Sequence, residues 1–385
     1  MDLNPLSAAL QERRRRGDTV VNLINTNFHD CGLFFPRDRL RSFLAGYADR
    51  QHYRPDPRGE ASLRRVIAAY YGGNPDDLIV TASTSDAYNL LFSVLCSPGD
   101  NVLFPSPGYP LFEYLARYHG LESRFYRLEF DHAFTLRPEA VATQLDENTR
   151  FLVLISPNNP TGRVYTPEEI RRVGAVAAEQ GVPIICDEVF SEYLYTAGGA
   201  TAEAATLPRP LEELPEQTVI TLNGISKLLA LPDLKLGWIL VTGPDAERRR
   251  LLGELELAND MFLNASGPAG HVTTLALPER EAFLAGARRH LQEARERLLG
   301  VASAIPELEL VPPEGGIHAV LRLPRGLPLT DEAFALALLE EWGVYLHPGY
   351  LYGFEDNRCL VISLLPGAEV VERGVAAVRE LLRRH

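Results

Sequence analysis

The sequence predicts an α/β fold: a large domain with a mostly parallel central sheet flanked by helices, plus a smaller α+β domain. Short apolar runs alternate with longer helical patterns between residues 62 and 259, and the pattern then changes. Such alternation is typical of a parallel sheet with helices packed on it. The 385 residues are enough for two domains. We expect residues 1–45 to be an N-terminal segment joining the small domain, residues 46–285 the large domain and residues 286–385 the small domain.

Seven apolar runs predict the strands of the large domain. They are rich in Val, Ile, Leu and Phe, and most lack alternation, as in strands buried on both faces. The runs are Leu78–Ser83, Asn101–Pro105, Arg124–Leu128, Phe151–Ser156, Pro183–Asp187, Val219–Leu222 and Gly237–Val241. Helices are predicted between them at Ser62–Tyr71, Asp86–Leu95, Tyr109–Tyr118, Pro167–Gln180 and Asp245–Asn259. Thr166 before Pro167 is a typical helix start, with Thr as the N-cap.

One long helix is predicted from about Pro268 to Leu299, and the smaller domain follows it. Its predicted strands are Leu308–Val311, Ile317–Leu323, Val344–Leu346 and Leu360–Leu364, with helices at Asp331–Trp342 and Ala368–Arg384. Residues 1–40 contain no complete unit, so we expect them to join this domain or cross to a partner subunit. The Arg13–Arg16 run is interpreted as a solvated helix face rather than a nucleic-acid contact.

Composition narrows the function classes. The net charge is −13, with 38 basic against 51 acidic residues, which disfavours a general nucleic-acid binder. No apolar run reaches the ~18–20 residues of a membrane span, and residues 1–16 hold no apolar signal core. The four cysteines lie far apart without a CxxC pair, which argues against a zinc site or a disulfide framework. We therefore expect a cytoplasmic protein without a metal or a membrane partner.

The chain contains two lysines, Lys227 and Lys235, both in one apolar segment. Lysine can lose its proton and attack a carbonyl group, whereas arginine cannot. Neither lysine follows a glycine, so a Walker A phosphate loop is absent. Lys227 comes soon after the strand Val219–Leu222, and ligands of open α/β sheets bind at the carboxyl ends of strands. Lys227 is thus a candidate nucleophile; a structural lysine is the alternative.

Three further polar segments follow predicted strands. Asp187 ends a very apolar strand, where a carboxylate is costly without a partner; it could pair with a protonated heterocyclic nitrogen, cap a helix or bind a metal. Residues 156–162 read Ser-Pro-Asn-Asn-Pro-Thr-Gly, which places asparagine on a stiff turn or forms an ordinary turn. Residues 81–87 combine hydroxyl groups with a helix start, which fits an anion site or plain N-capping.

Together these segments resemble one family over nearly the whole chain. The motifs are Tyr53-Arg54-Pro55-Asp56-Pro57-Arg58-Gly59 followed by Leu63-Arg64, Ser97-Pro98-Gly99-Asp100, Pro105-Ser106-Pro107-Gly108-Tyr109-Pro110, Asn159-Pro160-Thr161-Gly162, Asp187-Glu188-Val189 and Ser226-Lys227. The chain resembles the fold-type I pyridoxal 5′-phosphate enzymes, in the class I/II aminotransferase group of the aspartate aminotransferase superfamily. The resemblance implies pyridoxal 5′-phosphate as cofactor.

The resemblance also implies residue roles. Lys227 resembles the lysine that holds the cofactor as a Schiff base and then acts as general acid and base, and Asp187 resembles the carboxylate on the pyridine nitrogen. Asn159 resembles the donor to the ring O3′, and Tyr109 the aromatic residue that stacks on the ring. Tyr53 resembles a tyrosine that reaches the phosphate of the neighbouring subunit, which implies a homodimer. The phosphate group is expected to bind Ser83, Thr84, Ser226 and Lys235.

Four positions depart from the family pattern. Ser83 stands where glycine is usual, and Lys235 where arginine is usual, which keeps the charge but loses the bidentate fork.

Phe190 replaces a tyrosine that donates to O3′, unless Tyr193 or Tyr195 substitutes for it. Val361 replaces the arginine that binds the substrate carboxylate, and Arg358 is expected to point to the opposite strand face.

Two further residues, Asn27 and His29, lie where the family's N-terminal segment meets substrate.

The resemblance implies transfer of an amino group between an amino acid or amine donor and a keto acid. Another pyridoxal phosphate reaction on the same fold is the alternative: elimination, decarboxylation or Cα oxidation. A third possibility from another class is a pyridoxal phosphate-binding regulatory module. Formation of a keto acid with conversion of the cofactor to its amine form would separate these functions.

Overall fold

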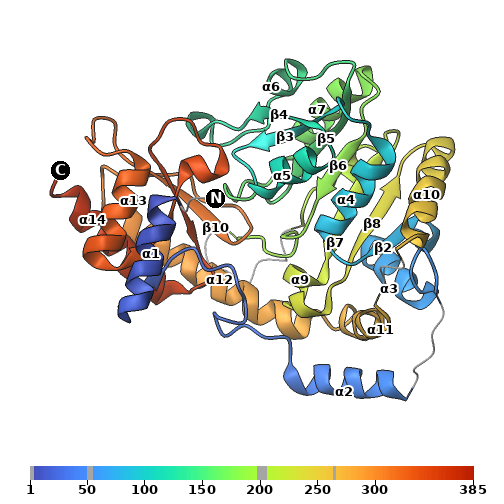
Figure 1. Ribbon diagram of the computed structural model, residues 1–385, viewed down its shortest axis with the longest axis horizontal. Helices are drawn as coiled ribbons and strands as arrows, with labels where there is room; N and C mark the ends of the chain where they lie inside the picture. The colour runs from blue at the N-terminus through green and yellow to red at the C-terminus, as the bar shows by residue number, and fades with distance from the viewer. Residues whose placement is uncertain (1–3, 50–54, 197–205, 263–265) are drawn as a thin grey trace.

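The computed structural model describes residues 4–49, 55–196, 206–262 and 266–385. Figure 1 shows two lobes, each built on a sheet. The larger sheet has seven strands in the order β2-β8-β7-β6-β5-β3-β4, and β8 is antiparallel to both of its neighbours. Its strands are β2 (Leu78–Thr81), β3 (Asn101–Ser106), β4 (Glu122–Arg127), β5 (Thr149–Ile155), β6 (Ile184–Asp187), β7 (Val219–Gly224) and β8 (Gly237–Thr242). All seven predicted strands are present, and the predicted α/β class is confirmed.

Helices cover both faces of this sheet, which explains why its strands lack alternation. Phe151, Val153 and Ile155 of β5 pack with residues of α4, α5 and α10. Leu152 and Leu154 pack with residues of α6 and α7 on the other face. The helices of this lobe are α3 (Ala61–Tyr71), α4 (Thr84–Leu95), α5 (Leu111–Tyr118), α6 (Pro138–Ala142), α7 (Pro167–Glu179), α8 (Pro210–Glu213), α9 (Ile225–Leu228), α10 (Asp245–Asp260) and α11 (Gly267–Ala276).

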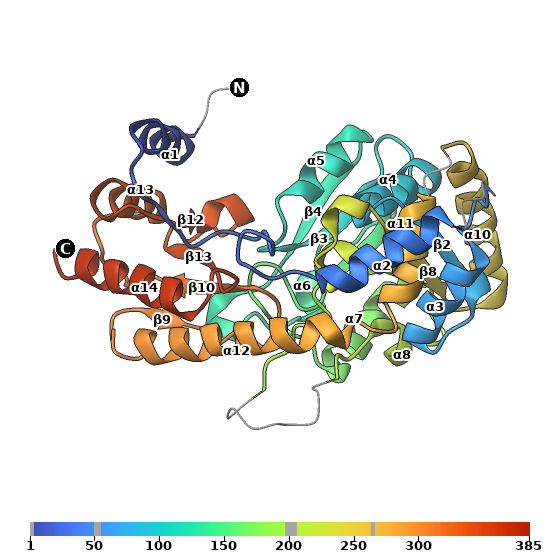
Figure 2. The same ribbon diagram turned by 90° about the horizontal axis from the view of Figure 1, so that it is seen from below.

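The smaller lobe holds a four-stranded antiparallel sheet in the order β12-β13-β10-β9. A short parallel pair, β1 with β11, ties the N-terminal segment to this lobe, with Val21 opposite Val344. The strands are β1 (Val21–Asn22), β9 (Glu309–Leu310), β10 (His318–Arg322), β11 (Val344–Tyr345), β12 (His347–Pro348) and β13 (Cys359–Ser363). The helices of this lobe are α1 (Pro5–Arg16), α12 (Glu281–Ala302), α13 (Asp331–Trp342) and α14 (Ala368–Leu382), whereas α2 (Arg37–Ala48) follows in the N-terminal segment. In Figure 2, α2 lies beside α11, on the larger lobe.

The prediction of one helix from about Pro268 to Leu299 is wrong. The structure has two helices there, and α11 ends at Ala276 before α12 begins at Glu281. Pro278 lies in the break. Proline has no backbone N–H and clashes with the preceding turn, so a helix cannot continue through it without distortion. The helix α2 is not predicted by the sequence pattern, because it has no fully buried residue and no side-chain cap at Pro36.

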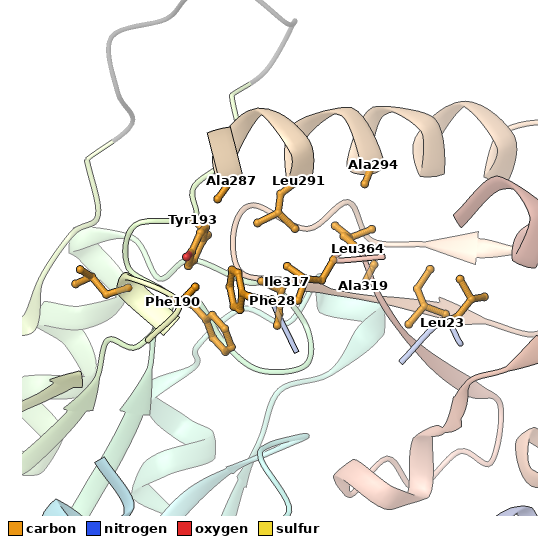
Figure 3. Packing of buried hydrophobic residues seen from close by; sticks show 14 of the residues in the cluster. Leu23, Phe28, Phe190, Tyr193, Ala287, Leu291, Ala294, Ile317, Ala319 and Leu364 are labelled. Carbon is orange, nitrogen blue, oxygen red and sulfur yellow. The ribbon is translucent and has the colours of Figure 1, made fainter. Parts of the chain in front are cut away.

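One buried cluster joins the two lobes. Figure 3 shows Phe28, Phe190 and Tyr193 packed together beneath the helix α12. The rings of Phe28 and Tyr193 lie 5.7 Å apart, and those of Phe28 and Phe283 lie 6.0 Å apart. Ile317 comes just before β10 and packs in the same cluster. The N-terminal segment, the larger lobe and β10 therefore meet at one place, next to the carboxyl ends of the central strands.

Candidate active site

The register of the central sheet brings three predicted segments to one edge. Ile155 at the end of β5 lies opposite Asp187, and Asp187 lies opposite Leu222 of β7. The carbonyl of Asp187 accepts from the N–H of Ser156 at 3.2 Å. The loop with Asn159, the end of β6 with Asp187 and the turn with Lys227 therefore follow neighbouring parallel strands. This edge is where ligands bind in open α/β sheets.

Asp187 is a buried carboxylate with two donors. The hydroxyl of Tyr88 donates to its Oδ2 at 3.2 Å, and the N–H of Val189 donates to its Oδ1 at 3.2 Å. Burial raises the pKa of Asp187 to about 6, although both hydrogen bonds oppose the rise. Each carboxylate oxygen can accept more than one hydrogen bond, so capacity remains for a cationic donor. Tyr88 is a site residue that sequence reasoning missed.

Lys227 lies in the short helix α9, directly after β7. Burial lowers the pKa of its ammonium group, and no described residue forms an ion pair or hydrogen bond with Nζ. The hydroxyl of Tyr193 donates to the carbonyl of Lys227 at 2.6 Å and holds the backbone of this turn. A buried amine with a lowered pKa is more often neutral, and so more nucleophilic, than an exposed lysine.

The loop after β5 presents an amide. Asn158 stabilises this loop, since its Oδ1 accepts from the hydroxyl of Thr161 at 2.8 Å. Asn159 is half-buried, and its Oδ1 is a buried atom without a hydrogen-bond partner among the described residues. Tyr109 is 44% exposed, and the nearby carboxylate of Asp187 contributes to raising its pKa. The Tyr109 ring therefore lies close to the same edge with an open face.

The start of α4 forms a donor cluster. The Oγ of Ser83 caps the helix by accepting from the N–H of Asp86 at 3.0 Å, so the plain N-capping function holds for this residue. Its hydroxyl hydrogen remains able to donate. Thr84 and Ser85 are in the first helical turn, where amide N–H groups lack partners within the helix. An anion at this end gains from these groups and from the helix dipole.

The other two residues predicted to bind the phosphate, Ser226 and Lys235, lie in the segment between β7 and β8. Ser226 is half-buried in α9, one residue before Lys227. Lys235 is exposed and has a left-handed backbone, with φ of 55°. Gly237 opens β8, and a Cβ there would lie 2.7 Å from the backbone carbon of Ser83. The lack of a side chain at residue 237 therefore lets β8 approach the start of α4.

The side chains of the two N-terminal candidates, Asn27 and His29, form hydrogen-bond contacts within the protein. The Oδ1 of the exposed Asn27 accepts from the N–H of His29 at 3.0 Å. The His29 Nε2 lies 2.7 Å from the carbonyl of Ala230, three residues after Lys227, and its ring stacks on Phe34 at 5.0 Å. The segment therefore lies against the Lys227 turn. Tyr53 lies outside the described residues.

The structure answers two questions raised by the departures. Tyr193 donates to the carbonyl of Lys227, and Tyr195 donates to the carbonyl of Gly316 at 2.6 Å. Neither hydroxyl proton is free to replace the tyrosine missing at Phe190.

The guanidinium group of Arg358 is also occupied by contacts within the protein. It donates to the carbonyl of Leu323 at 3.1 Å and pairs with Asp356. Val361 is fully buried in β13.

Two histidines of the smaller lobe also belong to this region and were missed by sequence reasoning. His318 is 4% exposed and lies edge-on to Phe190, with ring centroids 6.4 Å apart. Burial lowers its pKa to about 3, and the charges of Lys227 and His347 add to the effect. A histidine that follows Gly315-Gly316-Ile317 and opens an apolar strand was the available signal.

The residues fit pyridoxal phosphate by their chemistry. Asp187 can pair with a protonated pyridine nitrogen, and the amine of Lys227 can bind an aldehyde carbon. The Nδ2 group of Asn159 can donate to a ring oxygen, and the start of α4 suits a phosphate group.

Comparison with known proteins agrees with this geometry. The sequence profile "Aminotransferase class I and II" matches residues 36–378. The glutamate-pyruvate aminotransferase AlaA of Haemophilus influenzae is 26% identical over 378 residues, covering 95% of this chain and 91% of that protein. The S-alkyl-thiohydroximate lyase SUR1 of Arabidopsis thaliana is 31% identical over 350 residues, covering 85% of this chain and 72% of that protein.

A solved structure supports the fold. The alanine aminotransferase from Pyrococcus furiosus superimposes with a TM-score of 0.90 at 22% identity, covering 99% of this chain and 96% of that one. The profile match spans most of the chain. The chain therefore belongs to the class I and II aminotransferase family, whose members use pyridoxal phosphate as cofactor.

Proposed function

We propose that this aminotransferase moves an amino group from an amine or amino acid to a keto acid, and that Lys227 is the residue that performs the proton transfers. The observation that carries this proposal is the half-buried amine of Lys227, which has no carboxylate partner among the described residues and follows β7, the strand next to the one that ends at Asp187. When bound, pyridoxal phosphate supplies an aldehyde carbon for the amine and a ring that accepts electron density.

The other residues then have defined tasks. Asp187 holds a proton on the ring nitrogen, because a buried carboxylate stabilises a neighbouring cation. Asn159 donates to the ring oxygen, and Tyr109 stacks on the ring. Ser83, Thr84, Ser226 and Lys235 bind the phosphate. Lys227 removes a proton from the substrate carbon that bears the amino group and returns it two atoms away, a 1,3-proton shift. The lowered pKa of Lys227 favours this role as general base.

Borohydride reduction tests the assignment of Lys227. Reduction of the purified holoprotein should attach the cofactor to one lysine, and peptide mapping should find it on Lys227. Lys227→Ala should abolish the attachment, whereas Lys235→Ala should leave it. Attachment to Lys235, or a protein that stays colourless when pyridoxal phosphate is added, would refute the assignment.

The half-reaction tests the reaction class. We expect amino donors to convert the cofactor to its amine form with release of one keto product per site. Release of ammonia with an unchanged cofactor would instead indicate elimination, the activity class in the name of the relative SUR1. The comparison is informative because both kinds of protein match this chain over most of its length.

We also propose that the active form is a homodimer. Three large apolar side chains at the end of α10 are exposed: Leu257, Met261 and Phe262, at 71%, 70% and 69%. Such a patch on a monomer is costly in water and is typical of a subunit interface. Sedimentation should give twice the 42.7 kDa of one chain, and Met261→Asp should weaken the association. A fully active monomer would refute this proposal.

The domain division and the compartment remain proposals. We propose domains at residues 1–45, 46–285 and 286–385, which limited proteolysis would test. No helix within the described ranges is long and apolar enough to span a membrane. The four cysteines are free. We propose a reducing cytoplasm, because free thiols persist there.

A further inference from the structure

The turn that carries Lys227 has few hydrogen bonds of its own. The helix α9 has four residues, and the N–H of Leu229 closes it on the carbonyl of Ile225 at 3.1 Å. The last carbonyls of a helix lack donors within that helix. Over the ranges that the structure describes, no backbone N–H donates to the carbonyl of Lys227. The direction of this turn therefore depends on donors from elsewhere in the fold.

Tyr193 supplies such a donor from 34 positions away. Its hydroxyl donates to the carbonyl of Lys227 at 2.6 Å, and the residue is 1% exposed. Burial raises the pKa of Tyr193 well above the ordinary value, so the phenol keeps the proton that it donates. Figure 3 shows its ring packed with Phe28 and Phe190 beneath α12. Close packing holds a side chain in one rotamer, which fixes the direction of the hydroxyl group.

The backbone of Tyr193 is bound to the smaller lobe. The N–H of Gly316 donates to the carbonyl of Tyr193 at 2.7 Å, and Leu194 pairs antiparallel with Gly315. A Cβ at Gly315 would lie 2.8 Å from the Tyr193 carbonyl oxygen, so the two backbones are in close contact. These glycines come just before β10. We call residues 192–195 the junction segment, because they join the loop before β10 to the Lys227 turn.

Glu192 holds the same segment from the other side. Its carboxylate accepts from the hydroxyl of Tyr70 in α3 at 2.8 Å and forms ion pairs with Arg288 of α12 and with Arg280, at 3.5 Å, just before α12. Its carbonyl accepts from the Nε of Arg288 at 2.7 Å. The carboxylate is 15% exposed, so salt screens these pairs weakly. The junction segment is therefore fixed to both lobes before it reaches Lys227.

The place of the amine decides how well Lys227 can move a proton. A general base must lie within hydrogen-bond reach of the proton that it takes, and a misplacement of about 1 Å can cost about 100-fold in rate. Lys227 is half-buried and has no ion-pair partner among the described residues that would hold its side chain. The position of its backbone therefore has a direct effect on the position of the amine.

We propose that Tyr193 is a positioning residue of the reaction, and that its hydroxyl links the place of Lys227 to the junction segment and so to the smaller lobe. This inference rests on the proposed role of Lys227 and names a residue that acts through it. Tyr193 acts on the backbone of the lysine turn rather than on the substrate.

A matched pair of tyrosine variants tests the effect on the reaction. Tyr193→Phe removes the hydroxyl and keeps the ring. Tyr195→Phe is the control, because its hydroxyl is also buried and donates at the same 2.6 Å to a carbonyl, that of Gly316. With saturating L-alanine or L-glutamate, the loss of visible absorbance of the holoenzyme should be about tenfold slower in Tyr193→Phe, with KM and cofactor retention changed less than about threefold. Equal rates in the two variants would overturn the proposal.

Labelling of the lysines tests the contact without activity. Cofactor-free protein is treated with acetic anhydride at several pH values, and peptide mapping gives the reaction of Lys227, with the exposed Lys235 as an internal reference for the reagent. Burial lowers the pKa of Lys227, so a turn that exposes the amine more often should raise it. We expect the midpoint for Lys227 to rise by about half a pH unit, a threefold change in the ionisation equilibrium, in Tyr193→Phe but not in Tyr195→Phe. An unchanged midpoint in Tyr193→Phe would contradict the proposal.

A third variant covers the case in which Tyr193→Phe does not fold, as melting temperatures would show. Glu192→Gln keeps the shape of the side chain but loses the charge that binds the two arginines, so it should change the rate and the midpoint in the same direction by a smaller amount. An unchanged Lys227 in Glu192→Gln would then overturn the link to the junction segment. If borohydride does not attach the cofactor to Lys227 of the unmodified protein, the proposed function fails, whereas the midpoint in cofactor-free protein still decides whether Tyr193 acts on Lys227.

Discussion

Tyr88 and Asp187 are 99 positions apart in the chain and meet inside the larger lobe, where the Tyr88 hydroxyl donates to the carboxylate. The hydrogen bond favours the charged form of Asp187 and so lowers its pKa, whereas burial raises it. The balance sets how well this carboxylate can hold a cationic ring nitrogen. Tyr88 is accordingly a positioning residue in our description, because it acts through Asp187.

Replacing Tyr88 by phenylalanine should weaken cofactor binding. The pKa of Asp187 should rise further, so that less of it is charged at neutral pH. A hydrogen bond to a charged group contributes about 1.5–3 kcal/mol, which predicts roughly ten- to hundredfold weaker retention of the cofactor. Release during dialysis, followed by visible absorbance, measures this. Tyr126→Phe is the control, since it removes a buried hydrogen bond to the carbonyl of Val153 instead. Equal retention in both variants would contradict the role of Tyr88.

Lys235 should act as a point charge on the cofactor phosphate. Lys235→Met keeps most of the side-chain length and removes the charge, so cofactor affinity should fall by about tenfold at low salt. Because Lys235 is exposed, the difference from the unmodified protein should shrink as salt screens the charge. Arg249→Ala, which removes an exposed charge from α10, is the control. An affinity that is unchanged at low salt would exclude Lys235 from the phosphate site.

At the scale of elements, the approach of β8 to the start of α4 shapes the anion site. A Cβ at Gly237 would lie 2.7 Å and 2.9 Å from backbone atoms of Ser83 and Thr84, so an element would have to shift. Gly237→Ala should destabilise the fold by about 1–3 kcal/mol and weaken cofactor retention. Urea unfolding and dialysis measure the two effects. Gly253→Ala in α10, where a Cβ meets nothing within 4 Å, should cause neither.

Much of the element pattern follows from the sequence. The seven central strands and the capped start of α7 at Thr166 are found as predicted, because continuous apolar runs and a capping box are local signals. The break at Pro278 was missed, since the apolar pattern continues on both sides of it. The helix α2 was missed because it packs at the surface, where the sequence carries no strong apolar stripe.

At the scale of the whole molecule, four titratable groups that are largely shielded from water, two in each lobe, give opposing pH dependences. The pKa values of Asp187 and Glu188 are raised to about 6 and 7, chiefly by burial, so the folded state binds more protons than the unfolded state and stability falls as pH rises through about 4 to 7. The pKa values of His318 and His347 are lowered, so the unfolded state binds more protons than the folded state below about pH 6.5. Their contribution therefore makes the protein less stable as the pH decreases below this value.

His318→Asn should separate these contributions. With a folded pKa of about 3 and an unfolded value of about 6.5, His318 lowers the free energy of unfolding by about 2 kcal/mol on going from pH 7 to pH 5. The variant should therefore gain about this much relative to the unmodified protein over that interval. Urea midpoints at several pH values measure the difference, with the exposed His385→Asn as the control. A constant difference across the interval would show that His318 titrates in the folded state.

The sequence by itself determined the order of strands and helices, the edge of the sheet that carries the proposed site, and the chemical groups at that edge. Lys227, Asp187 and Asn159 could be found because each lies at or soon after the end of a predicted strand, and parallel strands end at one edge. Only the tertiary structure placed Tyr88 against Asp187, occupied the hydroxyls of Tyr193 and Tyr195 and brought the ring of His318 to Phe190. These contacts join segments tens of residues apart, and their distances depend on how helices and sheets pack, which no local pattern of residues specifies.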